Sequence, residues 1–286
     1  MDPASVAIVL VAAVVHAAWN LASKYKRGDT VLFVAGYTTV AAAVFLPLAV
    51  AAAVSGAQPV TWPLVAAAIV SALLHVAYSL TLQAGYDRAD LGVVYPIARG
   101  SGPIVTMLVA IPLLGERPSA LGIVGAVTVL AGILVVMGNP FRAGASHPLR
   151  GVAWGAATGV TIAAYTLWDA FAVGSLGLAP VSYYAGTLLA QVVLLAPSVL
   201  RRRAGIARSA RLDGIPILAV AVLSPLAYVL VLTVMQTAPV ALVAPLREAS
   251  IVVGSLLAWR LFRETGIARR LAGAAIVLVG IAVVGL

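Results

Sequence analysis

Apolar runs of roughly twenty residues recur along the whole chain, and this feature constrains the fold more than any other. A helix that crosses a bilayer needs about 20 predominantly apolar residues. Short stretches with Gly, Pro or charged residues separate the runs. We predict ten membrane-spanning helices, over residues 4–22, 30–54, 62–83, 91–113, 119–138, 151–173, 180–200, 214–236, 241–262 and 268–286.

The composition supports a membrane protein and narrows its chemistry. Of the 286 residues, 63% are hydrophobic and 9% are charged, whereas a soluble domain carries roughly 25% charged residues. The chain contains no cysteine, which excludes disulfides, thiolate metal sites and cysteine nucleophiles. No basic segment precedes the first apolar run, so we expect the first helix to be retained rather than cleaved as a signal peptide.

The two halves of the chain resemble each other at an offset of 148 residues. The matched positions are Arg99 with Arg247, Glu116 with Glu264, Gly125 with Gly273, and Gly132 with Gly280. Each half then holds five spans, and an odd number makes the halves cross the membrane in opposite senses. We predict an all-α integral membrane protein in which two inverted five-helix repeats, residues 1–141 and 149–286, surround a central cavity.

Loop charges predict the orientation. The connections after the odd-numbered spans hold nearly all the basic loop residues, and the opposite side holds only Arg117. The basic side carries Lys24, Lys26, Arg27, Arg88, Arg142, Arg150, Arg201, Arg202, Arg203, Arg208, Arg211, Arg260, Arg263, Arg269 and Arg270. By the positive-inside rule this side is cytoplasmic. We therefore expect a multi-pass protein of the cytoplasmic (inner) membrane, with both termini outside. The net charge of +9 then needs no nucleic-acid partner.

Several short motifs, in the order of the repeat, resemble the EamA-like ten-helix type of the drug/metabolite transporter superfamily. They are Gly-Glu-Arg-Pro at 115–118, Arg-Glu-Thr at 263–265, the glycine-bearing fifth span of each half, and His-Ala-Ala-Trp-Asn at 16–20. The resemblance implies two inverted four-helix walls around a cavity, with the fifth and tenth spans packed outside. It also implies transport of small metabolites, most often export of amino acids or related compounds. Many relatives have cytoplasmic termini, whereas the loop charges here indicate the reverse.

Ionisable groups at membrane depth are functional candidates because burying them in a bilayer is costly. Arg99 and Arg247 fall at equivalent positions of the two halves, and Glu248 and Asp169 balance their charge. The arginines suit a substrate carboxylate or phosphonate, which a guanidinium fork matches. Glu248 suits an ammonium group or a coupling proton. The alternative is a structural ion pair that fixes helix packing.

Aromatic residues on the predicted wall helices form a second candidate set: Trp19, Tyr78, Tyr95, Tyr165, Trp168 and Tyr228. Their rings suit stacking on an amphipathic substrate or a cation–π contact. Core packing or an interfacial belt is the alternative. His16 is a candidate proton relay, or it forms a hydrogen bond between helices. The sequence shows no metal-ligand spacing and no catalytic acid pair, so we expect no metal, no cofactor and no enzyme activity.

We predict a secondary transporter that moves a small polar or amphipathic metabolite, an amino acid or a similar molecule with an anionic group, by alternating access. Uptake of an organophosphonate or sulfonate, or export of a cationic drug, is a second transport hypothesis. A membrane-embedded scaffold or lipid-acting enzyme is the alternative of another class. The partners expected are the small-molecule substrate and the lipid bilayer. The sequence does not decide between a monomer and a homodimer.

Overall fold

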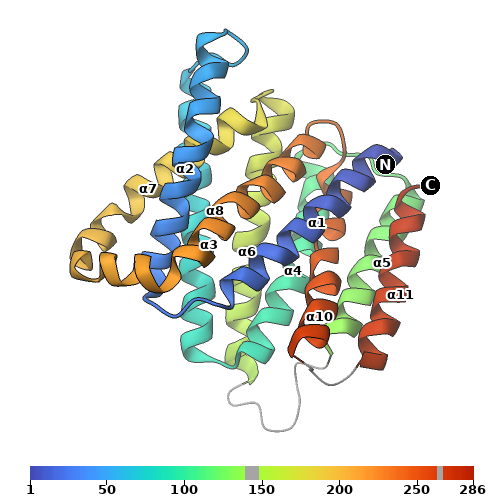
Figure 1. Ribbon diagram of the computed structural model, residues 1–286. Coiled ribbons are helices and arrows are strands. Elements are labelled where there is room, and N and C mark those ends of the chain that lie inside the picture. Colours follow the sequence, from blue (N-terminus) through green and yellow to red (C-terminus); the bar gives the residue numbers. More distant parts are fainter. Residues whose placement is uncertain (139–147, 263–266) are drawn as a thin grey trace.

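The chain is a bundle of long helices, shown in Figure 1. The computed structural model describes residues 1–138, 148–262 and 267–286, and no strand occurs among them. The elements are α1 (Pro3–Ser23), α2 (Thr30–Val54), α3 (Trp62–Arg88), α4 (Leu91–Leu113), α5 (Ala120–Met137), α6 (Pro148–Ala170), η1 (Phe171–Ser175), α7 (Pro180–Arg201), η2 (Arg203–Gly205), α8 (Ile206–Met235), α9 (Val240–Arg247), α10 (Ala249–Phe262) and α11 (Ile267–Val284).

Ten helical segments in the described part of the chain are long and apolar enough to cross a membrane. The prediction of an all-α membrane protein with ten spans is therefore confirmed. Helices suit a bilayer because they satisfy their own backbone hydrogen bonds, which lipid cannot do. Polar side chains cap several of their ends: Asp29, for example, accepts a hydrogen bond from the Leu32 amide at 3.0 Å. The predicted boundary at residue 141 and the motif at 263–265, with Arg142 and Glu264, lie outside the described residues.

Three predicted ends were wrong. Helix α3 continues to Arg88 instead of ending at residue 83, and α8 begins at Ile206 instead of residue 214. The sixth span continues past residue 173 as a π-helical turn, Phe171–Ser175. Charged residues marked the predicted ends near residues 83 and 214, but water beyond the membrane solvates such side chains while the helix continues. The end at residue 173 was predicted from Gly174 and Pro180. Apolar runs therefore locate the membrane-embedded part of a helix better than its end.

The ninth span is divided into two helices, which the sequence analysis treated as one. Helix α9 ends at Arg247, and α10 begins at Ala249. Between them, the Glu248 amide donates to the Pro245 carbonyl at 3.1 Å, a tighter turn than an α-helix makes. Proline removes a helix hydrogen bond at this depth and favours such a break. The break lies at Arg247 and Glu248, the two charged residues of the apolar stretch Val240–Leu257.

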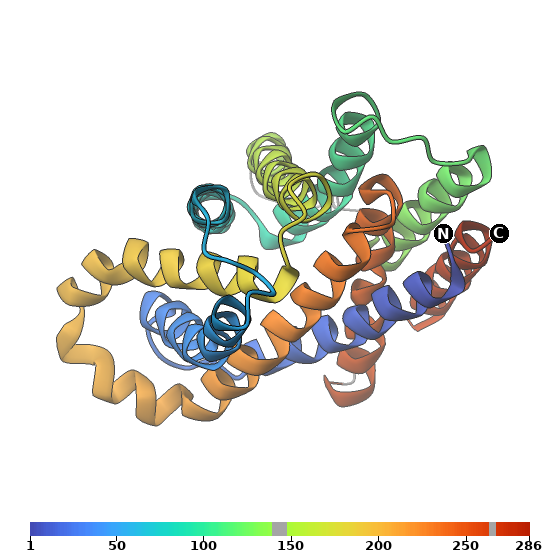
Figure 2. The same ribbon diagram turned by 90° about the horizontal axis from the view of Figure 1, so that it is seen from above.

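Glycines bring two pairs of helices into close contact. A Cβ atom added at Gly132 would lie 2.8 Å from the Gly273 carbonyl oxygen, so α5 and α11 pack backbone against backbone. A Cβ atom at Gly159 would lie 2.9 Å from the Gly102 amide, which brings α6 equally close to α4. These glycines therefore allow close packing of the two helix pairs. Figures 1 and 2 show α5 and α11 together at one edge, far from the corner where α7 turns into α8.

Among the described residues, three side chains near the ends of the bundle accept hydrogen bonds from backbone amides of the other half of the chain. Glu116, after α4, accepts hydrogen bonds from the first amides of α9, at 2.6 and 3.0 Å. Gln58, before α3, accepts one from the Ala179 amide at 2.8 Å. Asp213, on α8, accepts from the Arg27 and Gly28 amides at 2.7 and 3.0 Å. The halves are therefore linked near both ends of the bundle.

Candidate substrate site

Two adjoining cavities lie inside the bundle, and His16 and Arg99 line both of them. The inner one, called the central cavity below, has a volume of about 140 Å³ and is lined from α1–α4 and α6–α9. The outer one, called the vestibule, has a volume of about 510 Å³. It lies between the ends of α1, α3 and α5 and the start of α11, at the basic end of the bundle. Neither α5 nor α11 lines the central cavity.

Glu248 lies between two arginines. Its Oε2 is 3.4 Å from Arg99 Nη1, and its Oε1 is 3.5 Å from Arg247 Nη2. All three side chains are buried or nearly so, with exposed fractions of 1%, 11% and 5% respectively. The turn between α9 and α10 makes this possible, because it carries Arg247 and Glu248 away from regular helical geometry. One carboxylate thus compensates two guanidinium groups from two spans.

Arg247 retains unused hydrogen-bonding capacity. Among the described residues, its buried Nε and Nη2 atoms have no hydrogen-bond acceptor, although Nη2 is within ion-pair distance of Glu248. The side chain lines the central cavity, as does Arg99. Arg99 in turn lies over the ring of Tyr95, with 5.5 Å between the guanidinium carbon and the ring centroid. Buried donors without acceptors are costly, so a molecule with an oxyanion group fits beside Arg247.

Asp169 is buried in a different environment. The Tyr183 hydroxyl donates to its Oδ1 at 2.5 Å, and the Tyr228 hydroxyl donates to its Oδ2. His75 Nε2 lies 3.9 Å from Oδ2. The other ring nitrogen of His75 is 2.9 Å from the Ser71 carbonyl oxygen, which can only accept a hydrogen bond, so Nδ1 carries a proton and Nε2 faces Asp169. The hydroxyls of Tyr183 and Tyr228, rather than a cation, thus stabilise the Asp169 carboxylate.

Aromatic rings from four helices pack into one wall of the central cavity. His75 stacks on Tyr165 with 4.3 Å between ring centroids and 29° between planes, and Tyr78 meets Tyr165 edge-on at 5.5 Å. Tyr184 lies 4.8 Å from Tyr228. All five side chains line the cavity. The wall offers ring faces for an apolar group of a substrate.

Most of the predicted site residues line a cavity, and three do not. Trp19, Tyr78, Tyr165, Tyr228, Arg99 and Arg247 line the central cavity, and Tyr95 lines the vestibule. Glu248 and Asp169 lie behind the arginines and tyrosines that they contact. Trp168 donates from its indole nitrogen to the Ala67 carbonyl at 3.0 Å and therefore links α6 to α3. His16 lines both cavities, and its Nε2 has no partner among the described residues.

Several lining residues were not among the predicted site residues. His75, Tyr37, Tyr184 and Gln191 all line the central cavity. A signal existed for His75, which lies almost one helical turn before Tyr78 and therefore on nearly the same face. None existed for Tyr37 or Tyr184, since an isolated tyrosine in an apolar run is equally typical of core packing. No group of three or more potential metal ligands occurs among the described residues.

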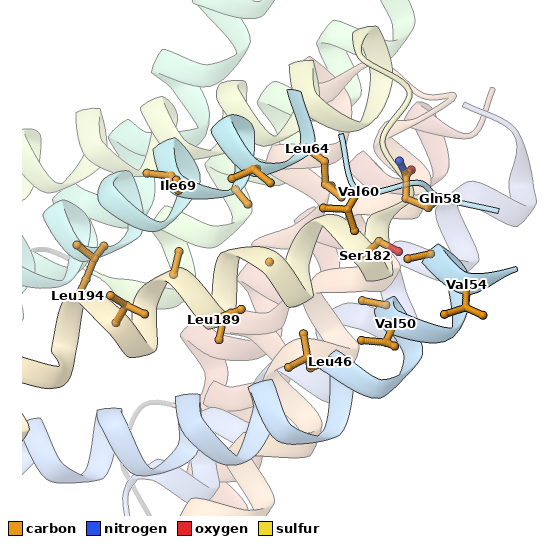
Figure 3. A pocket seen from close by; sticks show the side chains of 17 residues that line it. Leu46, Val50, Val54, Gln58, Val60, Leu64, Ile69, Ser182, Leu189 and Leu194 are labelled. Atoms are coloured by element: carbon orange, nitrogen blue, oxygen red, sulfur yellow. The ribbon is translucent and has the colours of Figure 1, made fainter. Parts of the chain in front are cut away.

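A third cavity differs from the other two in its lining. It is a groove of about 670 Å³ between α2, α3 and α7, shown in Figure 3. Its walls are aliphatic side chains such as Leu46, Ile69 and Leu189, and among the described residues only Gln58 and Ser182 line it with polar groups. Several of its residues, among them Val54 and Val193, are well exposed on membrane-spanning helices. The groove is almost entirely apolar, and within the described part of the chain it lacks the charged side chains that line the other two cavities.

Comparison with known proteins agrees with this architecture. Residues 4–138 match the EamA-like transporter family. The first half of the chain is therefore similar to that family. A crystal structure superposes on this chain with a TM-score of 0.78 over 99% of its length and 96% of the other protein's length. At 20% identity, that likeness shows the fold alone. No curated protein matches the chain. The ten apolar helices indicate a multi-pass membrane protein, and the match of residues 4–138 indicates transport of small molecules.

Proposed function

We propose that this transporter carries a small metabolite with an anionic group, an amino acid or a similar molecule, through the central cavity. The observation that carries the proposal is Arg247, whose buried guanidinium lines the cavity with two nitrogens lacking an acceptor. Arg99 lies on another wall of the same cavity. A carboxylate or phosphonate between them would satisfy those donors bidentately. The aromatic wall supports a substrate that also carries an apolar part.

A cationic drug fits the cavity less well. The described residues that line the central cavity and the vestibule include arginines, histidines and a lysine but no acidic side chain. Asp169 is buried, and two tyrosine hydroxyls and His75 already occupy its surroundings. A cation would therefore meet positive charge first. The lining favours an anionic over a cationic substrate.

Alternating access between two inverted repeats is the mechanism we propose. The offset of 148 residues between Arg99 and Arg247 supports the repeat, and the central cavity is lined by both halves of the chain. Contacts between the halves near each end of the bundle provide interactions to break and form as one side opens and the other closes. These are the Glu116, Gln58 and Asp213 hydrogen bonds. A carrier needs such reversible closure on both sides of its site.

The basic end of the bundle is the cytoplasmic end in this proposal, which rests on the fifteen-to-one division of loop Lys and Arg residues. The vestibule then faces the cytoplasm, and both termini face outward. Alkaline phosphatase fused after Leu286 should be active, because that enzyme matures only outside the cytoplasm. Bright fluorescence from green fluorescent protein fused there would reverse the orientation and leave the fold unchanged.

The substrate site is tested with Arg99→Lys and Arg247→Lys, which keep the charge but lose the guanidinium fork. A thermal-shift screen of purified protein against amino acids, alkylphosphonates and quaternary amines first identifies a binding compound. Each substitution should then weaken its binding by roughly ten- to a hundred-fold, as expected for loss of a charge-assisted hydrogen bond. Arg117→Lys, at an exposed position of the opposite end, is the control. Unaltered affinity in both cavity variants would refute the anion site.

A further inference from the structure

The side of the central cavity formed by α1 and α2 contains polar atoms without hydrogen-bond partners. Among the described residues, they are His16 Nε2, Trp19 Nε1 and Thr38 Oγ1. All three atoms are buried, and all three side chains line the cavity. His16 and Trp19 lie side by side, with 4.9 Å between their ring centroids. Buried polar groups in proteins are nearly always hydrogen-bonded, so three such atoms around one cavity need an explanation.

Polar groups elsewhere in the wall of the cavity have partners within the protein. The Tyr228 hydroxyl donates to Asp169, and the Ser79 hydroxyl donates to the His75 carbonyl at 2.9 Å. Both Tyr228 and Ser79 line the cavity. The bundle can therefore satisfy a polar side chain at this cavity, and the α1–α2 side differs from the rest of the wall.

Arg247 adds two more atoms of the same kind, its Nε and Nη2. Helix α1 packs against α9, which carries Arg247. Glu248 compensates the charge of this guanidinium group, so what the cavity needs here is hydrogen-bond partners rather than a counter-charge. One carboxylate accepts about four hydrogen bonds, whereas the α1–α2 side and Arg247 together hold five polar atoms without a partner among the described residues. A ligand with a carboxylate as its only polar group would leave part of the α1–α2 side unsatisfied.

The chemistry of Trp19 limits what the second polar group of a ligand can be. An indole nitrogen only donates a hydrogen bond, so it needs an acceptor. A hydroxyl or carbonyl oxygen accepts hydrogen bonds, whereas an ammonium group carries three donors and no acceptor. Among the described residues, no acidic side chain lines the cavity to bind an ammonium group. The α1–α2 side therefore suits an oxygen atom and not an amine.

The volume of the central cavity limits the size of the ligand. It is about 140 Å³, close to the roughly 150 Å³ of an engineered protein cavity that binds benzene. Pockets for drug-sized ligands measure about 300–1,000 Å³. The cavity therefore suits a molecule of about six non-hydrogen atoms, the size of benzene.

We propose that Trp19 and Thr38, together with His16, bind a second oxygen atom of the substrate, which is a short-chain hydroxy or oxo acid. The carboxylate of this acid lies at Arg247, and its hydroxyl or carbonyl oxygen accepts a hydrogen bond from the indole nitrogen of Trp19. The inference deepens the proposed function and rests on it for the carboxylate site. It narrows the anionic metabolite to a small acid with an additional oxygen in place of an ammonium group.

The test titrates the purified full chain with L-lactate, propionate and L-alanine by calorimetry at equal ionic strength. These acids differ at one carbon, which carries a hydroxyl group, a hydrogen atom or an ammonium group. A site that binds a hydroxyl group rejects analogues without it, so lactate should bind roughly ten-fold more tightly than propionate or alanine.

Two substitutions test the residues named for the second oxygen. Trp19→Phe keeps an aromatic ring without the N–H group, and Thr38→Val removes the hydroxyl group. Each should reduce the ratio of lactate affinity to propionate affinity and leave propionate binding nearly unchanged. Trp62→Phe, at an exposed tryptophan at the start of α3, is the control and should keep the ratio. The ratio is measured on one preparation, so it does not depend on the fraction of a variant that folds.

Three results would overturn the inference: no binding of lactate, binding of propionate or alanine as tight as that of lactate, or an equal loss of lactate and propionate affinity in Trp19→Phe. The last result would assign Trp19 to the carboxylate. Arg247→Lys separates the inference from the proposed function, because it should weaken lactate and propionate equally. If it does so while lactate and propionate bind the unaltered protein alike, the proposed function stands and this inference fails. If it changes neither affinity, the carboxylate site at Arg247 fails, whatever Trp19→Phe does to the ratio.

Discussion

Two buried carboxylates lie beside the same cavity, and they are stabilised in different ways. Glu248 is compensated by positive charge, with Arg99 and Arg247 at 3.4 and 3.5 Å. Asp169 is compensated by hydrogen bonds from two tyrosine hydroxyls, with His75 3.9 Å away. Neither carboxylate lines the cavity itself. Each carboxylate instead contacts side chains that line the cavity. Glu248 contacts Arg99 and Arg247, and Asp169 contacts Tyr228.

This difference gives two walls of the cavity, one with arginines and one with tyrosines, different net charges. Beside Glu248, two guanidinium groups share one carboxylate, so this wall has positive charge in excess and attracts an anion. Beside Asp169, one carboxylate is surrounded by two tyrosine hydroxyls and an imidazole, so this wall has no excess of positive charge. In the proposed function, the arginine wall therefore binds the anionic group of the substrate. Substitutions at each carboxylate test this comparison.

The largest effect is expected from Glu248→Gln. This change leaves Arg99 and Arg247 buried with no compensating charge, and breaking a buried ion pair in this way destabilises a protein by about 3–5 kcal/mol. The melting temperature and the yield of folded protein should both fall. Inorganic phosphate at high concentration should restore part of the melting temperature, since an anion between the arginines replaces the lost carboxylate.

The measurement is a thermal-shift assay of the purified variant with phosphate or acetate at the same ionic strength. Arg202→Gln, which removes an exposed partner of Asp29, is the control and should melt like the unaltered protein. A purely structural ion pair predicts a lower melting temperature that no anion restores. That outcome would leave Glu248 a packing residue and weaken the case for Arg99 and Arg247 as ligands.

A smaller effect is expected from Asp169→Asn. The amide keeps the shape of the side chain but not its charge, so the hydrogen bonds from Tyr183 and Tyr228 lose the charged acceptor. Hydrogen bonds to a charged group contribute roughly 1.5–3 kcal/mol, and the melting temperature should fall less than in Glu248→Gln. Substrate affinity should change less than in Glu248→Gln, because Asp169 contacts neither of the two arginines that line the cavity.

Double-mutant cycles with Tyr228→Phe and Tyr183→Phe show whether the two hydroxyls act through Asp169. Each tyrosine change should have little further effect once Asp169 has been replaced. Tyr25→Phe, at an exposed tyrosine of the loop after α1, controls for loss of a hydroxyl. Fully additive effects would mean that the tyrosines stabilise the wall by packing alone.

The sequence was a good guide to the spans and to the charged residues among them. Ten apolar runs predicted the ten helices, because apolar length is what a bilayer requires. Arg99, Arg247 and Glu248 stood out because charge at that depth is rare. The division of the ninth span at Glu248 was not predicted, since Pro245 is equally compatible with a kink or a continuous helix.

Contacts between helices that lie far apart in the sequence could not be predicted from the sequence. His75, Tyr183 and Tyr228 meet Asp169 from three helices, and only the packed bundle brings them together. In the sequence, Lys24 and Arg269 served only to predict the orientation in the membrane. A basic residue near a helix end has the same sequence pattern whether its side chain faces water or a cavity. The two inverted repeats, 1–141 and 149–286, stay a prediction.

A third carboxylate, Glu116, extends the comparison to the end of the bundle. It is half-buried, between α4 and α5, and accepts hydrogen bonds from the Val240 and Ala241 amides. Burial raises the pKa of Glu116 above its usual value, and the two amide donors oppose that rise only in part. The folded protein therefore binds a proton at this residue more readily than the unfolded chain does. The stability that Glu116 contributes is larger below its raised pKa and decreases as the pH rises through it.

The smallest effect is accordingly expected from Glu116→Gln, and it should depend on pH. A charge at a helix N-terminus contributes about 0.3–1 kcal/mol, so the variant should melt close to the unaltered protein at pH 7. As the pH falls from 7 toward 4.5, the ordinary pKa of a glutamate, the unaltered protein should gain stability relative to Glu116→Gln. Melting temperatures of both proteins across this range measure the gain, with Asp87→Asn, at an exposed carboxylate, as the control. A difference in melting temperature between the two proteins that stays constant, or that shrinks as the pH falls, would contradict this prediction. It would show that Glu116 stays ionised beside the α9 amides over this pH range.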